Sequence, residues 1–358
     1  MSGRALLYGA TGYTGREVAQ RLAGGLELVL AGRDEARVRA LALSLDLPWR
    51  AFDLVDVGRI AEALSDIDVV LHAAGPFELT AGPMIDACLA TRTHYLDLAG
   101  EWTVFHDAMA LDAAARAAGV MVMPGVGLTI VATDCLLALA KATWPDTERL
   151  RLGISRAQVI TRGSVASASR LLSPDVLIRR GGELVTVPAA SLTHAFDFGN
   201  GLRETVALSW ADVVTGGFTT GVGDIEVYSE LDWGQRASFR ASALAMRLTG
   251  VGAWRQAAGA FAAAWPSKPS EEARRDARFV MVAEALDPWR RTRRLRMRTL
   301  DGYSVSVATA AAAVERVLAG DASPGFETPA RVFGPRFILE RGGAIIEGPY
   351  QPAQGAAA

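Results

Sequence analysis

The chain has 358 residues, of which half are hydrophobic and 21% are charged, and its formal net charge is −2 at pH 7. This length favours two domains, and the apolar content excludes a disordered chain. The charge balance argues against a dedicated nucleic-acid-binding protein, and the two cysteines, Cys88 and Cys135, are too few for a disulfide scaffold or a cysteine-cluster metal site.

The first 125 residues alternate short apolar runs with helical patterns. The predicted strands are Ala5–Tyr8, Leu26–Ala31, Trp49–Phe52, Val69–Ala74, His94–Leu98 and Val120–Met123. The predicted helices are Gly12–Leu22, Asp34–Leu45, Val57–Leu64, Pro83–Ala90 and Thr103–Ala118. Apolar strands that alternate with amphipathic helices are typical of a parallel sheet covered on both faces. We therefore predict an α/β fold with an N-terminal Rossmann-type, doubly wound parallel sheet.

A glycine motif, GATGYTG over Gly9–Gly15, joins the first predicted strand to the first predicted helix. In a dinucleotide site Gly9 permits a tight turn, Gly12 lets the backbone approach a pyrophosphate, and Gly15 lets the helix pack against the strand. The start of the helix offers N–H donors and the positive end of the helix dipole. We predict a dinucleotide site rather than an ordinary glycine-rich turn, with further contacts from Thr11, Tyr13 and Thr14.

The end of the second predicted strand bears on the choice between NAD and NADP. An NAD site requires an acidic residue there, but the sequence has Arg33 followed by Asp34. Arg33 is suited to a 2′-phosphate, which favours NADP(H), while Asp34 as a ribose ligand is the alternative. Asp53 follows the third strand and is placed either to meet the adenine or to cap the next helix.

After residue 150 the pattern changes to strands separated by turn signals. Predicted strands are Leu150–Ala157, Ala207–Trp210, Ile225–Leu231, Phe279–Leu286 and Leu295–Leu300, and predicted helices are Ala237–Ala264 and Val305–Leu318. Gly199–Gly201 is typical of a turn between antiparallel strands. We expect Phe279–Leu286 and Leu295–Leu300 to be neighbours in a second, α+β domain.

Six arginines lie within Arg290–Arg298. Arg294, Arg296 and Arg298 alternate with Leu295, Met297 and Thr299, so a strand here has one basic face and one core face. The basic face is either a solvated surface or a docking patch for an anionic carrier, such as a phosphopantetheine-bearing protein or coenzyme A.

Four segments carry a resemblance to a known family: Ala73–Phe77 (AAGPF), His94–Glu101 (HYLDLAGE), Pro124–Gly127 (PGVG) and Arg162–Ser164 (RGS). With them the chain resembles the saccharopine dehydrogenase family, and within it the branch of trans-acting enoyl reductases. In that branch a Phe-Asp-Ser-(Val/Ile)-Pro-Ser-Asp segment is usual, and of it Leu128–Asp134 keeps the last aspartate alone.

The resemblance implies an NADP-binding first domain and a second domain with a largely antiparallel sheet. It also implies a C-terminal segment that returns to the first domain, and a homodimer. We expect the NADP-binding domain over residues 1–125, the substrate and dimerisation domain over 126–325, and the returning segment over 326–358. The family segment containing Arg162 and Ser164 suggests, with Gly127, a substrate-binding role.

The loops after the parallel strands carry the candidate chemistry, because ligands bind beyond the carboxyl ends of such strands. We expect Ala74, Gly75, Pro76 and Phe77 to lie near the nicotinamide. Glu101 is the candidate acid and a substrate contact, and helix capping is its structural alternative. Asp97 and Tyr95 are further catalytic candidates, although a core tyrosine is the alternative for Tyr95.

The sequence also excludes one rival class of reductase. The chain has two lysines, Lys141 and Lys268, and neither has a tyrosine four residues before it. The Tyr-x-x-x-Lys pair of short-chain dehydrogenases is therefore missing. The four histidines show no ligand spacing, so we expect no metal site, and His72 reads as a core residue.

These observations predict an NADPH-dependent oxidoreductase that reduces an enoyl or keto group of an acyl or polyketide-like substrate, free or carrier-bound. The alternatives are an imine or amino-acid type dehydrogenase and a non-catalytic NADP-binding sensor or scaffold. Neither a signal-peptide pattern nor a span of ~20 apolar residues is apparent, which favours the cytoplasm and leaves membrane contact through a surface patch open.

Overall fold

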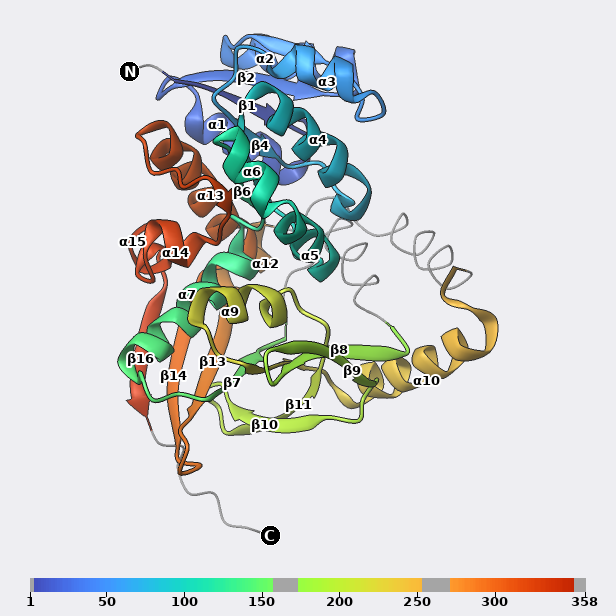
Figure 1. Cartoon of the computed structure of the whole chain (residues 1–358), viewed down its shortest axis with the longest axis vertical. Coiled ribbons are helices and arrows are strands. Elements are labelled where there is room, and N and C mark those ends of the chain that lie inside the picture. The colour runs from blue at the N-terminus through green and yellow to red at the C-terminus, as the bar shows by residue number, and fades with distance from the viewer. Residues whose placement is uncertain (1–2, 157–172, 253–270, 351–358) are drawn as a thin grey trace. The chain divides into compact units, whose positions relative to one another are not determined.

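The computed structural model describes residues 3–156, 173–252 and 271–350 (Figure 1). Contacts divide the chain into two compact units. The first unit holds the described residues up to Val131 together with Tyr303–Gly342, and the second unit holds those of Ala132–Gly302 and from Gly343 onward.

A parallel sheet of seven strands forms the centre of the first unit. The strands are β1 (Arg4–Tyr8), β2 (Glu27–Gly32), β3 (Trp49–Ala51), β4 (Val69–His72), β5 (His94–Asp97), β6 (Met121–Met123) and β15 (Gly325–Phe326). Their order is β15-β6-β5-β4-β1-β2-β3, and each neighbouring pair is parallel. The first six strands have the order of a doubly wound sheet, so the predicted Rossmann-type fold is confirmed.

The helices between these strands follow the predicted pattern with two differences. They are α1 (Tyr13–Leu22), α2 (Glu35–Leu45), α3 (Val57–Leu64), α4 (Phe77–Thr91), α5 (Trp102–Ala110) and α6 (Asp112–Ala118). The helix predicted over Thr103–Ala118 is two helices, because Leu111 has a φ of −90° and a ψ of 4° and ends α5. Helix α4 begins six residues before the predicted start at Pro83, since Pro76 already occupies its N-cap position.

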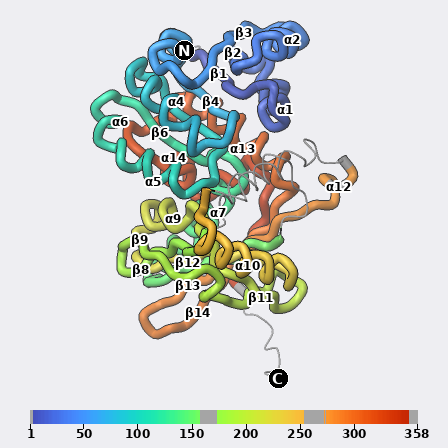
Figure 2. Tube along the Cα trace, turned by 90° about the vertical axis from the view of Figure 1, so that its right-hand side faces the viewer, coloured from blue at the N-terminus to red at the C-terminus, as the bar shows by residue number. Residues whose placement is uncertain are grey.

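The C-terminal part of the first unit consists of α13 (Gly302–Leu318), β15, α14 (Pro329–Phe333) and α15 (Phe337–Arg341) (Figure 2). The Thr309 hydroxyl donates a hydrogen bond to the Val126 carbonyl at 2.8 Å, and the Ser306 hydroxyl accepts one from the Leu128 amide at 3.0 Å. From the sequence we expect the C-terminal segment to return to the first domain at residue 326. In the structure it rejoins the first unit from Tyr303, because α13 already makes these contacts.

The second unit is built on a sheet of nine strands. They are β7 (Arg149–Ile154), β8 (Asp175–Arg180), β9 (Glu183–Pro188), β10 (Thr193–Asp197), β11 (Leu202–Ala207), β12 (Asp224–Glu230), β13 (Phe279–Leu286), β14 (Thr292–Thr299) and β16 (Ile345–Tyr350). Strands β7 and β12 pair in parallel, and the other pairs within the described residues are antiparallel. The predicted largely antiparallel sheet is therefore confirmed.

Two predictions for this sheet are confirmed and two are wrong. The turn at Gly199–Gly201 joins β10 to β11, and β13 pairs with β14, both as predicted. The strand predicted over Ala207–Trp210 instead ends at Ala207. Strand β16 pairs with β14, so this part of the segment assigned to the first domain belongs to the second sheet.

Helices α7 (Leu128–Thr143), α9 (Asp212–Thr220), α10 (Trp233–Thr249) and α12 (Glu271–Asp276) accompany the second sheet. The Phe196 ring lies in its core, against Gly153 of β7, where an added Cβ would come within 2.5 Å of the ring. Helix α10 covers the first part of the helix predicted over Ala237–Ala264, and residues 253–264 of that prediction lie outside the described residues.

A buried carboxylate in the second unit makes stability depend on pH. Asp212 is fully buried on α9, and its pKa is raised from 3.8 to about 7 by loss of solvation, with the Asp134 charge adding to the rise and Thr133 opposing it. In the unfolded chain this carboxyl group loses its proton above its ordinary pKa of 3.8, whereas in the folded protein it keeps the proton up to a pH of about 7. The free energy of unfolding therefore falls as the pH rises between these two values.

Asp212→Asn is therefore expected to be more stable relative to the wild type at pH 8 than at pH 5.5. The difference between the two pH values should be roughly 2 kcal/mol in the free energy of unfolding. Denaturant titrations at both pH values measure it, and Asp276→Asn, at an exposed position of the same unit, is the control. An Asp212→Asn effect of equal size at both pH values would contradict the assignment.

The described parts of the chain contain no helix with the length and apolar character that a membrane crossing requires. Within the same residues, His, Cys, Asp and Glu side chains form no group of three suited to a metal ion.

Candidate active site

The glycine motif forms a tight turn between β1 and α1. Gly9 has a φ of +84°, and its amide donates a hydrogen bond to the Ala31 carbonyl at 2.8 Å. A Cβ on Gly9 would come within 2.8 Å of the Ala73 backbone, and a Cβ on Gly15 within 2.3 Å of the Gly9 carbonyl oxygen. A side chain at either position would therefore collide with neighbouring backbone. Glycine at both positions lets the turn pack closely against α1 and the residue after β4.

Helix α1 begins directly at this turn. Its N-cap residue is Gly12, no side chain caps the helix, and its first turn has no acidic residue. The start of α1 is thus a place where backbone N–H groups and the helix dipole favour an anion. The Tyr13 ring packs edge-on against Tyr303 of α13 at 5.3 Å between ring centroids, so Tyr13 has a packing role within the motif.

Arg33 and Asp53 both lie near the end of β1. Burial raises the pKa of Tyr8 to about 12, and the charges of Arg33 and Asp53 act on it in opposite directions. The Tyr8 hydroxyl donates to the Phe52 carbonyl at 3.0 Å. The structure thus brings the two predicted cofactor residues to the same end of the sheet, from the loops after β2 and β3.

The capping interactions in these loops bear on the alternatives for both aspartates. The Asp34 carboxylate accepts a hydrogen bond from the Arg37 amide at 3.1 Å and caps α2. Asp56, and not Asp53, caps α3. The capping alternative for Asp53 is therefore wrong, and Asp34 has a structural task that competes with binding a ribose.

The loop after β4 contains the predicted nicotinamide contacts Ala74–Phe77. Thr80 donates to the Ala74 carbonyl at 2.9 Å and lies 2.9 Å from Nε2 of His72. The Phe77 ring is 8% exposed and packs edge-on against His72 at 5.3 Å between ring centroids. His72 is buried, which lowers its pKa to about 3, and it is the core histidine that the sequence predicts.

Asp97 organises the end of β5. Its carboxylate accepts hydrogen bonds from the Ala99 amide at 2.8 Å, the Gly125 amide at 2.7 Å and the Tyr95 hydroxyl at 2.7 Å. Asp97 and Tyr95 are both fully buried, and loss of solvation raises the pKa of Asp97 to about 7. These contacts connect the loop after β5 to the loop after β6, so Asp97 acts here as a positioning residue.

Glu101 stands beside this pair. It occupies the N-cap position of α5 without capping the helix through its side chain, so the capping alternative is wrong. Its carboxylate instead accepts a hydrogen bond from the Gly100 amide at 2.9 Å, and Glu101 is 3% exposed. Its charge raises the pKa of both Asp97 and Tyr95, which puts the three candidate residues in one neighbourhood.

Three further residues were predicted to contact the substrate, and the structure describes one of them. Gly127 is buried, and a Cβ there would lie 3.2 Å from the Ser306 hydroxyl of α13. Arg162 and Ser164 lie outside the described residues.

Three hydroxyl residues that contribute to this region were not predicted from the sequence. Thr80 holds the loop after β4, and Ser306 with Thr309 holds the loop after β6. Hydroxyl residues within otherwise apolar helical patterns are a signal for such roles, but their partners are 6, 178 and 183 residues away in sequence.

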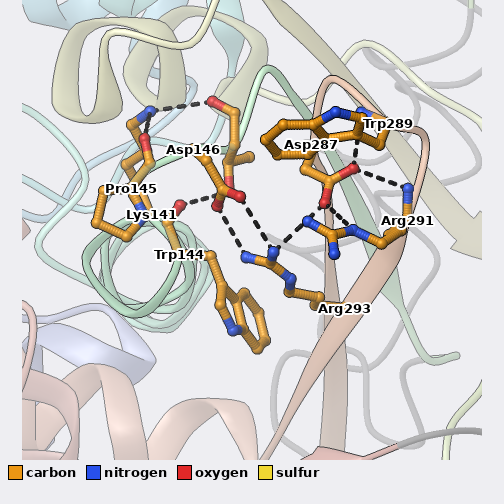
Figure 3. A network of polar contacts seen from close by, with 9 residues as sticks. Lys141, Trp144, Pro145, Asp146, Asp287, Trp289, Arg291 and Arg293 are labelled. Atoms are coloured by element: carbon orange, nitrogen blue, oxygen red, sulfur yellow. Dashed lines mark hydrogen bonds and ion pairs between the residues drawn. The ribbon is translucent and has the colours of Figure 1, made fainter.

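The arginines of β14 are paired with carboxylates. Arg293 pairs with Asp146 at 2.8 Å and with Asp287 at 3.3 Å, and Arg291 also pairs with Asp287 (Figure 3). On the opposite face Arg294 pairs with the buried Glu284 at 2.7 Å.

The alternation predicted for this strand is confirmed, since Leu295 and Met297 are buried on its core face. Arg296 and Arg298 share Glu347 of β16. The paired arginines join β14 to its neighbouring strands, so holding the sheet together is their first role.

Comparison with known proteins points to one family. Residues 5–123 match the family model of the saccharopine dehydrogenase NADP binding domain. A trans-acting enoyl reductase from Mycobacterium ulcerans is 34% identical over 104 residues, which are 27% of this chain and 25% of that protein. One from Mycobacterium leprae is 30% identical over 138 residues, or 36% of this chain and 33% of that protein. The match thus spans between a quarter and a third of these relatives' length.

Solved structures agree in fold. Saccharopine dehydrogenase (L-Glu forming) from Saccharomyces cerevisiae has a TM-score of 0.63 at 14% identity, covering 97% of this chain and all of that one. Homospermidine synthase from Legionella pneumophila, solved with NAD, has a TM-score of 0.64 at 9% identity, covering 95% of this chain and 89% of that one. The resemblance predicted from sequence is confirmed over residues 5–123, which match the saccharopine dehydrogenase NADP binding domain.

Proposed function

We propose that this chain is an NADPH-dependent oxidoreductase that reduces an enoyl or keto group of an acyl or polyketide-like substrate. Its first domain matches an NADP-binding domain of a dehydrogenase family, and this match supports oxidoreductase activity. The observation that carries the proposal is the turn at Gly9–Gly15, where added Cβ atoms would collide with backbone and α1 starts without a side-chain cap. The similarity to trans-acting enoyl reductases favours acyl chemistry.

The residues present fit NADP(H). Backbone amides at the start of α1 would bind the pyrophosphate, and Arg33 would bind the 2′-phosphate because a guanidinium matches its oxygens bidentately. Asp53, near Arg33, would meet the adenine. The loop Ala74–Phe77 would border the nicotinamide ribose, held by Thr80.

The bound cofactor would supply a hydride, and the protein must supply the proton and exclude water. We assign the proton to Glu101, which is 3% exposed and lies beside Asp97 at the end of β5. Asp97 would position the two loops that border Glu101, with the Tyr95 hydroxyl orienting the Asp97 carboxylate.

Deuteride transfer from 4-deuterated NADPH to a panel of enoyl, keto and imine thioesters and acids tests the function. We expect deuterium at the β carbon of an enoyl substrate or at the carbonyl carbon of a keto substrate. Label appearing only in imine products would favour the imine or amino-acid type dehydrogenase. Tight NADPH binding without transfer to any member of the panel would favour the sensor or scaffold.

Glu101→Gln tests the proton donor within the same assay. It should lower kcat about a hundredfold or more and leave the Kd for NADPH within about twofold, because Glu101 is assigned to the substrate. Glu78→Gln, a change of the same size at the start of neighbouring α4, is the control. If Glu101→Gln keeps the wild-type kcat, another group donates the proton.

A further inference from the structure

A short series of polar contacts joins the end of β4 to the first turn of α4. Nε2 of His72, the last residue of β4, lies 2.9 Å from the hydroxyl oxygen of Thr80. The same hydroxyl lies 2.9 Å from the Ala74 carbonyl oxygen and 3.1 Å from the Pro76 carbonyl oxygen. His72 and Thr80 thus contact each other across the loop that connects the strand to the helix.

These distances decide which imidazole nitrogen carries the proton. A hydroxyl has one hydrogen to donate, and the two carbonyl oxygens beside Thr80 have none, so the hydroxyl must donate toward them. The Thr80 oxygen then accepts from His72, which places the imidazole proton on Nε2. The opposite arrangement would leave the carbonyls against an oxygen without a hydrogen. It would also bury an N–H at Nδ1, an atom that has no hydrogen-bond partner among the described residues.

The surroundings of His72 hold the ring in one place and in its neutral form. The ring is fully buried, and loss of solvation lowers its pKa to about 3. Phe77 packs edge-on against it at 5.3 Å between ring centroids, and Tyr8 and Tyr95 lie at 5.6 and 6.4 Å. An imidazole of this kind does not exchange protons near neutral pH. It is suited to the role of a fixed hydrogen-bond donor.

We propose that His72 is a positioning residue that acts through Thr80 on the loop Ala74–Phe77, and thereby on the nicotinamide half of the bound cofactor. Its Nε2–H directs the Thr80 hydroxyl hydrogen toward the two loop carbonyls. The same imidazole supports the Phe77 ring through the edge-on contact. This inference rests on the proposed function, which places the loop at the nicotinamide ribose.

Nitrogen-15 NMR of the cofactor-free protein tests the hydrogen-bond assignment directly. We expect His72 to show a protonated Nε2 and an unprotonated Nδ1, with both resonances unchanged from about pH 5 to pH 8. The spectrum of His72→Leu identifies the signals, because those of His72 are missing from it. A proton on Nδ1, or an imidazole that titrates within this range, would overturn the assignment.

Calorimetric titrations with NADP⁺ and with adenosine 2′,5′-bisphosphate test the positioning role, because the second probe lacks the nicotinamide half. His72→Leu removes the donor and keeps an apolar side chain, and Thr80→Val removes the hydroxyl and keeps the shape. One lost hydrogen bond corresponds to a change of about three- to tenfold in Kd for NADP⁺ in each variant. The Kd for adenosine 2′,5′-bisphosphate should stay within about twofold, which also shows that the first unit is folded.

Conservative variants separate the hydrogen bond from simple packing. Thr80→Ser keeps the hydroxyl and should restore NADP⁺ affinity to within about twofold of the wild type. Thr91→Val is the matched control, since it removes a hydroxyl from the same helix that bonds the Ala87 carbonyl instead of the loop. It should leave the affinity for both probes unchanged.

The outcomes distinguish this inference from the proposed function. Equal losses for the two probes in His72→Leu and Thr80→Val, no loss for either probe, or no recovery in Thr80→Ser would each overturn the positioning role alone. Wild-type protein that binds neither probe would overturn the proposed function, and this inference with it.

Discussion

Gly15→Ala is expected to abolish most of the NADPH affinity and to destabilise the first unit. A Cβ at this position would lie 2.3 Å from the Gly9 carbonyl oxygen and 3.1 Å from the Ala10 Cα, and both neighbours are backbone atoms. Helix α1 must therefore move away from the turn, which displaces the N–H groups proposed to bind the pyrophosphate. We expect a loss of about 1–3 kcal/mol in the free energy of unfolding and a Kd for NADPH raised at least about tenfold.

Gly82→Ala is the matched control for this prediction. Gly82 lies inside α4 of the same unit, and an added Cβ there meets nothing within 4 Å. Alanine is favoured over glycine in a helix by up to about 1 kcal/mol, so this variant should keep its NADPH affinity and gain slightly in stability. Denaturant titration and cofactor-fluorescence titration measure the pair. Wild-type NADPH affinity in Gly15→Ala would show that the turn does not form the phosphate site.

Arg33→Ala is expected to change cofactor preference. If its guanidinium binds the 2′-phosphate, the variant loses a charge-assisted contact that NADH never makes. Hydrogen bonds to charged groups contribute about 1.5–3 kcal/mol, so the KM and Kd for NADPH should rise roughly tenfold to a hundredfold. The values for NADH should stay within about twofold.

The control for Arg33 is Arg39→Ala, which removes the same charge from an exposed position of α2. It should leave the ratio of NADPH to NADH affinity unchanged. Equal losses for both cofactors in Arg33→Ala would mean that the guanidinium stacks on the adenine or supports the loop, and that another group reads the 2′-phosphate.

The sequence by itself determined the architecture of the first unit. Its strands are short and apolar, its helices are amphipathic, and both patterns depend on neighbouring residues, so β1 through β6 could be predicted within a few residues. The glycine motif was recognisable for the same reason, because its task is a local turn between a strand and a helix. The cap that Asp34 provides for α2 is equally local, since a cap acts on amides within three residues.

Only the tertiary structure decided which polar residues share an environment. Asp97 accepts a hydrogen bond from Gly125, 28 residues away, and Arg294 is paired with the buried Glu284 through the register of two strands. Burial and pairing depend on these long-range contacts, which no local pattern encodes, and they determine whether a carboxylate can hold a proton or an arginine can bind a ligand.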